Sequence, residues 1–311
     1  MAIINPAAGG GRCGQRVGAA LDQLRSAGIS LETVETHATA EASKIAREAY
    51  LEGRRKFLAI GGDGTAYEVV NGLFPAAQEQ IPKGSAENIP TLGLLPLGTG
   101  NSFLRDFQDL PSHESGLEHA MRALQGKRSR PCDVLRLTHE TGTIYYTNAL
   151  SMGFAGDVAM LRHRRFQSLG QFGYLLAIFV GLAKLNRRPI PVRFAIDSES
   201  QSDFDRRPCL FLTFNNSKFT GGTMMIAPDA ITDDGLIEYV RWGPIGRVAL
   251  IRNLPTLYDG THTSHPLAEH HAVRRVEFQL DSPIDVVVDG EVLSLNCKFI
   301  DVLPSALRVV V

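Results

Sequence analysis

The residues that most clearly predict chemistry form a glycine-rich loop, Gly61-Gly62-Asp63-Gly64-Thr65. The loop follows a compact apolar run, Phe57–Ile60, as expected for a strand covered on both faces. Its glycines allow a sharp turn and the close approach of a ligand to the backbone. Thr65 and Glu68 have the spacing of a capping box, which predicts that a helix starts behind the loop and favours an anion there. Asp63 would repel a bare phosphate but could hold Mg²⁺ or a hydroxyl beside one; the alternative is a tight turn with a solvated acid.

Two further loops rich in small residues follow other predicted strands. One is Asn5–Arg12, after the strand Ala2–Ile4, and the other is Pro96–Ser102, after the strand Thr91–Leu95. In an open parallel sheet, ligands bind outside the carboxyl ends of the strands. Three such loops at one edge therefore predict a single crevice suited to a polyphosphate.

Two common nucleotide motifs explain these loops less well. Gly9, Gly11 and Gly14 satisfy the spacing G-x-G-x-x-G, with Glu32 and Glu35 about 20 residues further on, as in a dinucleotide site. That motif leaves the other two loops unexplained. A Walker A loop is absent, because no Gly-Lys-Ser/Thr occurs in the sequence. Nucleotide binding is thus expected to be of a different kind.

An acidic pair lies near the C-terminus, in Asp289-Gly290-Glu291 after the apolar run Ile284–Val288. The spacing puts two carboxylates on one tight turn, where one of them could accept a proton. Asp-Gly is also a common hairpin signal, and from these residues alone a hairpin with solvated acids is favoured.

The elements that must position the loops alternate between strand and helix over residues 1–130. This alternation predicts a parallel sheet with helices on both sides. Strands are expected at Ala2–Ile4, Ile29–Thr36, Phe57–Ile60 and Thr91–Leu95, and helices at Gln15–Ala27, Glu41–Glu52, Ala66–Phe74 and Leu117–Leu124.

Residues 131–311 consist mainly of strand-like runs bounded by Gly, Pro, Asn or Asp, which predicts an antiparallel β-sandwich domain. The last run, Leu307–Val311, could return to either domain. The other expected strands are Asp133–Thr138, Thr143–Leu150, Val192–Ile196, Cys209–Phe214, Leu236–Arg241, Val273–Leu280 and Ile284–Val288.

Composition excludes some classes of protein. The chain has 311 residues, 44% of them hydrophobic, and a net charge of −1, which argues against a nucleic-acid-binding protein. Four scattered cysteines indicate reduced thiols in the cytoplasm. No leader is expected after Met1, and the longest apolar stretch, Phe172–Leu185, is too short to span a bilayer and predicts a buried helix. Any membrane association is expected to be peripheral, at the inner surface.

Motifs along nearly the whole chain resemble the diacylglycerol kinase and sphingosine kinase family, especially its bacterial soluble lipid kinases. The resemblance implies an NAD-kinase-like N-terminal domain, ATP and Mg²⁺ as cofactors and a lipid hydroxyl as the phosphate acceptor. It is carried by the opening NPAAGGGR, GGDGTAYEVVNGL, LPLGTGNSFLRDF, Asn216-Ser217 with Gly221-Gly222, Ala227–Ala230, Asp233–Leu236, His262–Pro266 and Asp289–Glu291.

The same resemblance implies roles for individual residues. Glu291 would be the base that takes the acceptor's proton, with Asp289 close by. Asp234 would bind a structural Mg²⁺ through its carboxylate, and Ile231 and Leu236 through their main-chain carbonyls. Asp63 would organise the nucleotide and its magnesium, and Glu68 would cap or hold the loop. The nucleotide would be bound by Asn5, Thr36, Gly61, Gly62, Asp63, Gly64, Thr65, Ala66, Tyr67, Glu68, Gly98, Thr99 and Asn101.

The acceptor is left open between a diacylglycerol-like and a sphingoid lipid, because Ser102 stands where users of diacylglycerol often have an acid. The basic run Arg162–Arg165, beside the apolar helix, is the candidate membrane contact, with a solvated basic turn as the alternative. A homodimer is left open. The competing functions are an NAD kinase, a catalytically silent nucleotide- or lipid-binding protein and a dinucleotide-dependent oxidoreductase.

Overall fold

Short apolar strands at the N-terminus assemble a parallel sheet in the order β2-β1-β3-β4-β17 in the computed structural model. The structure describes residues 1–81, 86–98, 101–107, 115–126, 128–166, 170–183, 185–195 and 203–311. Because both faces of the central strands are covered, β1 and β3 are almost wholly apolar. The strands are β1 (Ala2–Ile4), β2 (Thr33–Glu35), β3 (Lys56–Gly61), β4 (Thr91–Pro96) and β17 (Cys297–Val310).

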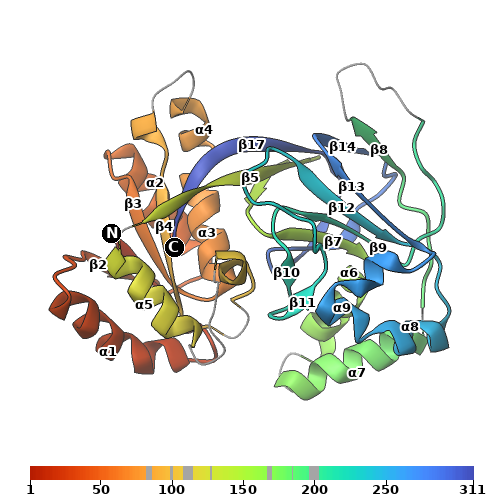
Figure 1. The fold of residues 1–311 in the computed structure, drawn as a ribbon, viewed down its shortest axis with the longest axis horizontal. Coiled ribbons are helices and arrows are strands. Elements are labelled where there is room, and N and C mark those ends of the chain that lie inside the picture. Colours follow the sequence, from red (N-terminus) through yellow and green to blue (C-terminus); the bar gives the residue numbers. More distant parts are fainter. Residues whose placement is uncertain are drawn as a thin grey trace. The chain divides into compact units, whose positions relative to one another are not determined.

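Helices cover both faces of this sheet (Figure 1). The helices α1 (Arg12–Ser26) and α5 (Gly116–Gly126) pack on the face that carries Ile4, Leu58 and Ile60. On the opposite face, α2 (Glu41–Leu51) packs against α3 (Asp63–Leu73) so closely that a Cβ at Gly72 would lie 2.2 Å from the Ser43 carbonyl oxygen. Three short elements complete this part: α4 (Ala76–Gln80), η1 (Ala86–Asn88) and η2 (Phe103–Phe107).

Two mainly antiparallel sheets form the second part of the fold. Their facing aromatic side chains pack together, with ring centroids 4.5 Å apart for Phe194 and Tyr239 and 5.3 Å apart for Phe214 and Phe278. One sheet contains β5 (Ser129–His139), β6 (Gly142–Tyr146), β8 (Val192–Ala195), β14 (Arg275–Phe278) and the start of β17. The other has the order β13 (Ala268–Val273), β12 (Ile237–Trp242), β9 (Phe211–Asn215), β7 (Ala149–Gly153), β15 (Ile284–Val288) and β16 (Glu291–Leu295).

Helices pack on the outer face of the six-stranded sheet. Leu182, Val240, Trp242, Leu250 and Leu257 belong to one buried cluster there, so the middle strands of this sheet are buried on both faces. The elements are α6 (Phe154–Leu161), the π-helical turn η3 (Arg162–Phe166), α7 (Gly170–Ala183), α8 (Arg247–Asn253), α9 (Thr256–Asp259) and η5 (Thr261–Ser264), beside the small hairpin of β10 (Phe219–Thr220) and β11 (Met224–Met225).

The chain divides into two compact units. One contains Met1–Val134, Thr232–Asp234 and Leu303–Val311, and the other contains Leu135–Ile231 and Gly235–Val302. The end of the chain thus belongs to the first unit, where Arg308 and Val309 of β17 pair with Thr91 and Leu92 of β4. The domain boundary between residues 130 and 131 stays a prediction.

The predicted fold class is confirmed, whereas several element bounds differ. The run Thr143–Leu150 was expected as one strand but forms β6 and β7, because Thr147 and Asn148 donate backbone hydrogen bonds to the Asp289 carboxylate instead of continuing a ladder. The run Val273–Leu280 contains the end of β13 and all of β14.

The described part of the chain holds no membrane-spanning helix and only buried cysteines. None of its helices is long and apolar enough to cross a membrane. All four cysteines lie within the described residues, and each is a buried free thiol. The predicted buried helix is α7, in which Ala177 is buried but Phe179 is 65% exposed.

Candidate active site

The three predicted loops lie together at the carboxyl edge of β1, β3 and β4. The Asn5 N–H donates to the Ile60 carbonyl oxygen at 3.0 Å, which links the first loop to β3. The N–H groups of Leu97 and Gly98 both donate to the Gly61 carbonyl oxygen, at 2.8 and 2.7 Å. The prediction that the second and third loops share one edge is therefore confirmed, and the hydrogen bonds explain how they are fixed.

Gly98 lies directly against the backbone of the Gly61–Thr65 loop. A Cβ added at Gly98 would lie 2.4 Å from the Gly62 Cα, and a Cβ added at Gly61 would lie 2.3 Å from the Thr65 hydroxyl. Only glycine fits at such close approaches. The two loops thus pack backbone against backbone, and a side chain at either position would push them apart. We call this close contact of Gly61, Gly62 and Gly98 the glycine cradle.

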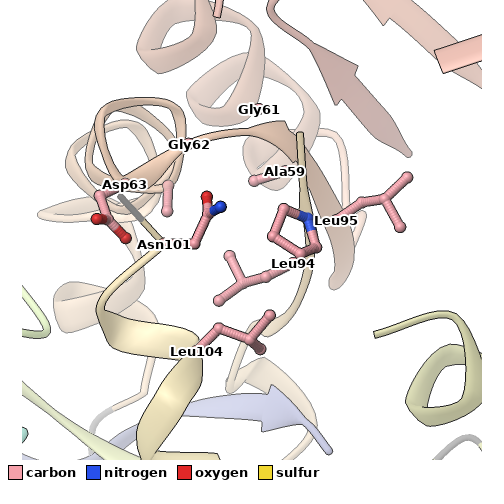
Figure 2. Close-up of a pocket in the computed structure, with 10 residues that line it drawn as sticks. Ala59, Gly61, Gly62, Asp63, Leu94, Leu95, Asn101 and Leu104 are labelled. Atoms are coloured by element: carbon pink, nitrogen blue, oxygen red, sulfur yellow. The ribbon is translucent and has the colours of Figure 1, made fainter. Parts of the chain in front are cut away.

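An open pocket lies beside this cradle, and its empty space of about 250 Å³ includes open solvent (Figure 2). Ala59, Leu94, Leu95, Pro96 and Leu104 give it apolar walls. Its polar groups come from the loops, and the Asn101 amide points into it toward the glycine loop. Of the residues predicted to bind nucleotide, it is lined by Gly61, Gly62, Asp63, Ala66 and Asn101. An apolar pocket with a few convergent polar groups is typical of a small-molecule site.

Asp63 holds the start of η2. Its carboxylate accepts a hydrogen bond from the Ser102 N–H at 3.0 Å. Burial raises the pKa of Asp63, and the N–H groups of Ser102, Phe103 and Asn101 and the Ser102 hydroxyl partly oppose that rise. The Asp63 carboxylate, which belongs to the Gly61–Thr65 loop, is therefore held in place by the Pro96–Ser102 loop.

The capping box predicted for Thr65 and Glu68 is wrong. The helix α3 begins at Asp63, so Thr65 lies within its first turn, and Gly62 is the N-cap residue without a side-chain cap. Glu68 instead accepts hydrogen bonds from the N–H groups of Ala40 and Ala42, at 3.0 and 3.2 Å, and so caps α2. A tertiary contact between two helices has replaced the local one.

The Thr65 hydroxyl has an environment that favours a ligand. It is buried, points at Gly61 and has no hydrogen-bond partner among the residues that the structure describes. Buried hydroxyls are normally hydrogen-bonded, and an exception needs an explanation. Together with the glycine cradle, this hydroxyl fits a phosphate-bearing ligand at the loop.

The other predicted nucleotide residues have varied surroundings. Asn5 accepts a hydrogen bond from the Ala7 N–H at 3.2 Å and shapes the first loop. Thr36 is buried after β2, and its hydroxyl donates to the Ile4 carbonyl at 3.2 Å. Gly64 and Tyr67 lie in the first turns of α3 and are partly exposed. Thr99 lies outside the described residues.

The acidic pair is divided between a buried and an exposed carboxylate. Asp289 is 6% exposed, and its carboxylate accepts hydrogen bonds from the N–H groups of Thr147, Asn148 and Ala149, at 2.9 to 3.0 Å. Glu291, two residues further on, is exposed at the start of β16. Asp289 has φ +48° and is followed by Gly290 at φ +92°, as in the tight turns that suit Asp and Gly. The predicted hairpin is confirmed, but the prediction that both acids are solvated is wrong for Asp289, which is buried and fixes the backbone. Glu291 is exposed.

Sequence reasoning gave no role to a group of buried polar residues beside this hairpin. The Ser217 hydroxyl donates to the Asn148 side-chain oxygen, and the Asn216 amide donates to the Thr147 carbonyl at 3.0 Å. These residues fix the same backbone that Asp289 binds. Asn216 and Ser217 are adjacent in sequence, but Asn148 is 68 residues earlier, and only the pairing of β7 with β9 brings them together.

The predicted metal ligands Ile231, Asp234 and Leu236 lie in the turn before β12. Ile231 is 55% exposed, and the Thr232 carbonyl accepts a hydrogen bond from the Asp133 N–H at 2.7 Å. A carboxylate and two carbonyl oxygens are ligands that suit Mg²⁺. This ligand set stays a prediction.

We expect Gly98→Ala to destabilise the first unit and to weaken nucleotide binding at the same time. The added methyl must displace the Gly62 backbone, and such overpacking costs about 1–3 kcal/mol in free energy of unfolding. Gly18→Ala is the control, because Gly18 lies in α1 with nothing within 4 Å of an added Cβ. It should raise stability by up to about 1 kcal/mol. Urea unfolding measures the free energy of unfolding of both variants. Equal changes in the two variants would contradict the close approach of the loops.

We expect Asp63→Asn to change the pH dependence of stability in a defined direction. The pKa of Asp63 is raised in the fold above its ordinary value of 3.8, so ionisation costs more in the folded than in the unfolded chain. We therefore expect the free energy of unfolding of the wild type to fall relative to that of Asp63→Asn as the pH rises from about 3.5 to 7. Urea unfolding across this range measures the difference, and a constant value would show that burial does not perturb Asp63.

Comparisons with known proteins agree with this architecture. Residues 1–137 match the family model of the diacylglycerol kinase catalytic domain, and residues 148–311 match that of the YegS C-terminal NAD kinase beta sandwich-like domain. A Xanthomonas euvesicatoria protein named "Probable lipid kinase YegS-like" is 31% identical over 93% of this chain and 89% of its own length. A diacylglycerol kinase of Bacillus subtilis is 28% identical over 93% of this chain and 88% of its own length.

A solved structure has the same fold. The crystal structure of a diacylglycerol kinase from Bacillus anthracis superposes with a TM-score of 0.68, at 19% identity, over 99% of this chain and 95% of that chain.

Proposed function

Because this chain belongs to the diacylglycerol kinase family and is a lipid kinase, we propose that it transfers the γ-phosphate of ATP to a lipid hydroxyl with the help of Mg²⁺. The observation that carries the proposal is the cradle of Gly61, Gly62 and Gly98 at the edge of a parallel sheet, with a pocket beside it. Phosphoryl transfer depends mainly on positioning and on neutralisation of charge.

The nucleotide would bind with its phosphates against the glycine cradle. The N-terminus of the 11-residue helix α3 points its dipole at this place, which favours an anion. The Thr65 hydroxyl would donate to a phosphate oxygen, and the Asn101 amide would contact the ligand from the third loop. Asp63 would hold Mg²⁺, which would neutralise charge on the phosphates. Asn5, Thr36, Tyr67 and Thr99 would contact the same nucleotide. Glu68 would support this site indirectly, by capping α2.

Glu291 would act as the general base. Its carboxylate is exposed and can accept a proton from the acceptor hydroxyl, whereas the Asp289 carboxylate is buried against backbone N–H groups. Asp289 would therefore be a positioning residue, which holds the hairpin so that Glu291 keeps its orientation. Asp234, with Ile231 and Leu236, would bind a structural Mg²⁺.

The acceptor would be a diacylglycerol-like or sphingoid lipid. We propose that the chain acts in the cytoplasm and contacts the inner membrane surface through Arg164 and Arg165 of η3, which are exposed, and Phe179 of α7. Basic residues near an anionic bilayer contribute about 1 kcal/mol each. Co-sedimentation with anionic vesicles should exceed that with neutral ones and should weaken in an Arg164→Glu, Arg165→Glu double variant. Equal sedimentation in all cases would refute the contact. The homodimer stays a prediction.

Nucleotide binding can be tested by calorimetry apart from catalysis. We expect the wild type to bind ATP more tightly with Mg²⁺ than without it, and Asp63→Asn to lose most of that difference, about tenfold in Kd or 1.4 kcal/mol. Asp22→Asn on the surface of α1 is the control, because the Asp22 side chain is 76% exposed. Equal binding by the Asp63 variant and the control would remove Asp63 from the nucleotide site.

A further inference from the structure

We propose that Asp229, Glu238 and His270 form a binding site for a divalent transition-metal ion, with Zn²⁺, Co²⁺ or Mn²⁺ as suitable occupants. Each of the three side chains offers one ligand atom, and these atoms all lie within 4.8 Å of one another. All three residues belong to the second unit. The site is independent of the proposed kinase function, because binding can be measured without a reaction.

The pairing of β12 with β13 brings Glu238 and His270 together. Val240 lies opposite His270, and Glu238 lies opposite Ala272, so Glu238 and His270 are diagonal neighbours. Side chains two residues apart on a strand share a face, which places both on the face that carries Val240. His271 points to the opposite face, where its ring stacks on Tyr239.

The third ligand is Asp229, which lies on the segment Ala227–Ala230, ahead of β12 in the sequence. Ala227 and Ala230 are buried against Val240 and Trp242 on the same face of the sheet. This packing fixes the short segment that carries Asp229, and its carboxylate reaches the His270 ring. The His270 Nδ1 lies 3.3 Å from an Asp229 oxygen and 3.6 Å from a Glu238 oxygen.

These distances match the edges of a metal coordination shell. Two ligands about 2.1 Å from a cation, at tetrahedral or octahedral angles, lie about 3.0–3.4 Å apart. The two edges from His270 Nδ1 are within a few tenths of an ångström of this range. The two carboxylate oxygens lie within 4.8 Å of each other, and binding of an ion would draw them together. Glu238 is 8% exposed, and a buried carboxylate gains from a nearby cation.

The set of ligands also indicates which ion is preferred. An imidazole with two carboxylates suits Zn²⁺, Co²⁺ or Mn²⁺, whereas Mg²⁺ takes oxygen ligands and keeps several waters. This chemistry differs from that of the all-oxygen set of Ile231, Asp234 and Leu236. A bound ion would tie the Ala227–Ala230 segment to the six-stranded sheet, and so would stabilise the second unit. The alternative is a protonated His270 that only pairs with the two acids.

The test uses the full chain after dialysis against EDTA. Calorimetric titration should give saturable binding of Zn²⁺ or Co²⁺, Co²⁺ should show the absorption bands of a nitrogen- and oxygen-ligated ion, and the metal should raise Tm. His270→Gln and Asp229→Asn should each weaken binding at least about tenfold and remove the rise in Tm. Both residues are exposed, so neither variant is expected to unfold.

His271→Gln is the matched control, because His271 is the next residue and lies on the other face of the sheet. It should bind metal like the wild type. The proposal is overturned if no ion binds, if His270→Gln binds as tightly as the wild type, or if His271→Gln loses as much affinity as His270→Gln. Binding of Mg²⁺ with the same affinity as Zn²⁺ would refute the proposed preference for transition metals.

Discussion

Glu291→Gln is expected to lower the rate of phosphate transfer by about 10²- to 10⁴-fold, the usual contribution of a general base. Glutamine keeps the size and one oxygen of glutamate but does not accept a proton. Because Glu291 is exposed, the substitution should leave the fold and the free energy of unfolding unchanged. The Kd for ATP should also stay the same, since the nucleotide groups lie on other elements, so the loss should appear in kcat.

The matched control for this variant is Asp281→Asn, which neutralises another exposed acid of the second unit. Steady-state kinetics of both variants, with thermal unfolding as a check on folding, measure the effect. Transfer by Glu291→Gln within threefold of the wild type would remove Glu291 from the chemistry.

Asp289→Ala is expected to lower the free energy of unfolding more than Gly98→Ala or Asp63→Asn does. The substitution removes the acceptor of the N–H groups of Thr147, Asn148 and Ala149, which all donate to the Asp289 carboxylate. Each buried donor left without a partner costs about 1–3 kcal/mol, so the variant should lose about 3 kcal/mol or more. Alanine is also disfavoured at φ +48°.

Asp289→Asn separates the structural role from a catalytic one. Asparagine tolerates this φ and keeps the oxygen that accepts from Asn148 and Ala149, so its loss of stability should be smaller. If Asp289 only positions the hairpin, transfer by folded Asp289→Asn should fall less than tenfold. Urea unfolding and kcat are the two measurements. A stable Asp289→Asn variant with transfer as low as that of Glu291→Gln would identify Asp289 as the base instead.

Much of the first unit could be predicted, because its signals are local. Alternating apolar runs and helical segments gave the parallel sheet, and the glycines after β3 and β4 marked loops that meet at one edge. Sequence spacing gave a wrong prediction where a side chain could bind either its own helix or a neighbouring one. Glu68 has the spacing to cap its own helix, yet its carboxylate caps α2, which packs alongside.

Features that depend on strand pairing could not be predicted. His270 is 32 residues beyond Glu238, and no spacing rule joins them before the register of β12 and β13 is known. The break between β6 and β7 likewise depends on Asp289, which lies far along the chain. The apolar walls of the pocket, such as Leu94 and Leu104, look like ordinary core residues in the sequence.

The central claim is that this chain phosphorylates a lipid hydroxyl, and a transfer assay tests it most directly. Labelled phosphate from ATP would be followed into diacylglycerol, monoacylglycerol, sphingosine, ceramide and phosphatidylglycerol in micelles, with NAD⁺ in parallel. We expect one class of lipid to be labelled in a Mg²⁺-dependent manner by the wild type and to stay unlabelled with Glu291→Gln. Label on NAD⁺ alone, or no product from a protein that binds ATP, would contradict the account.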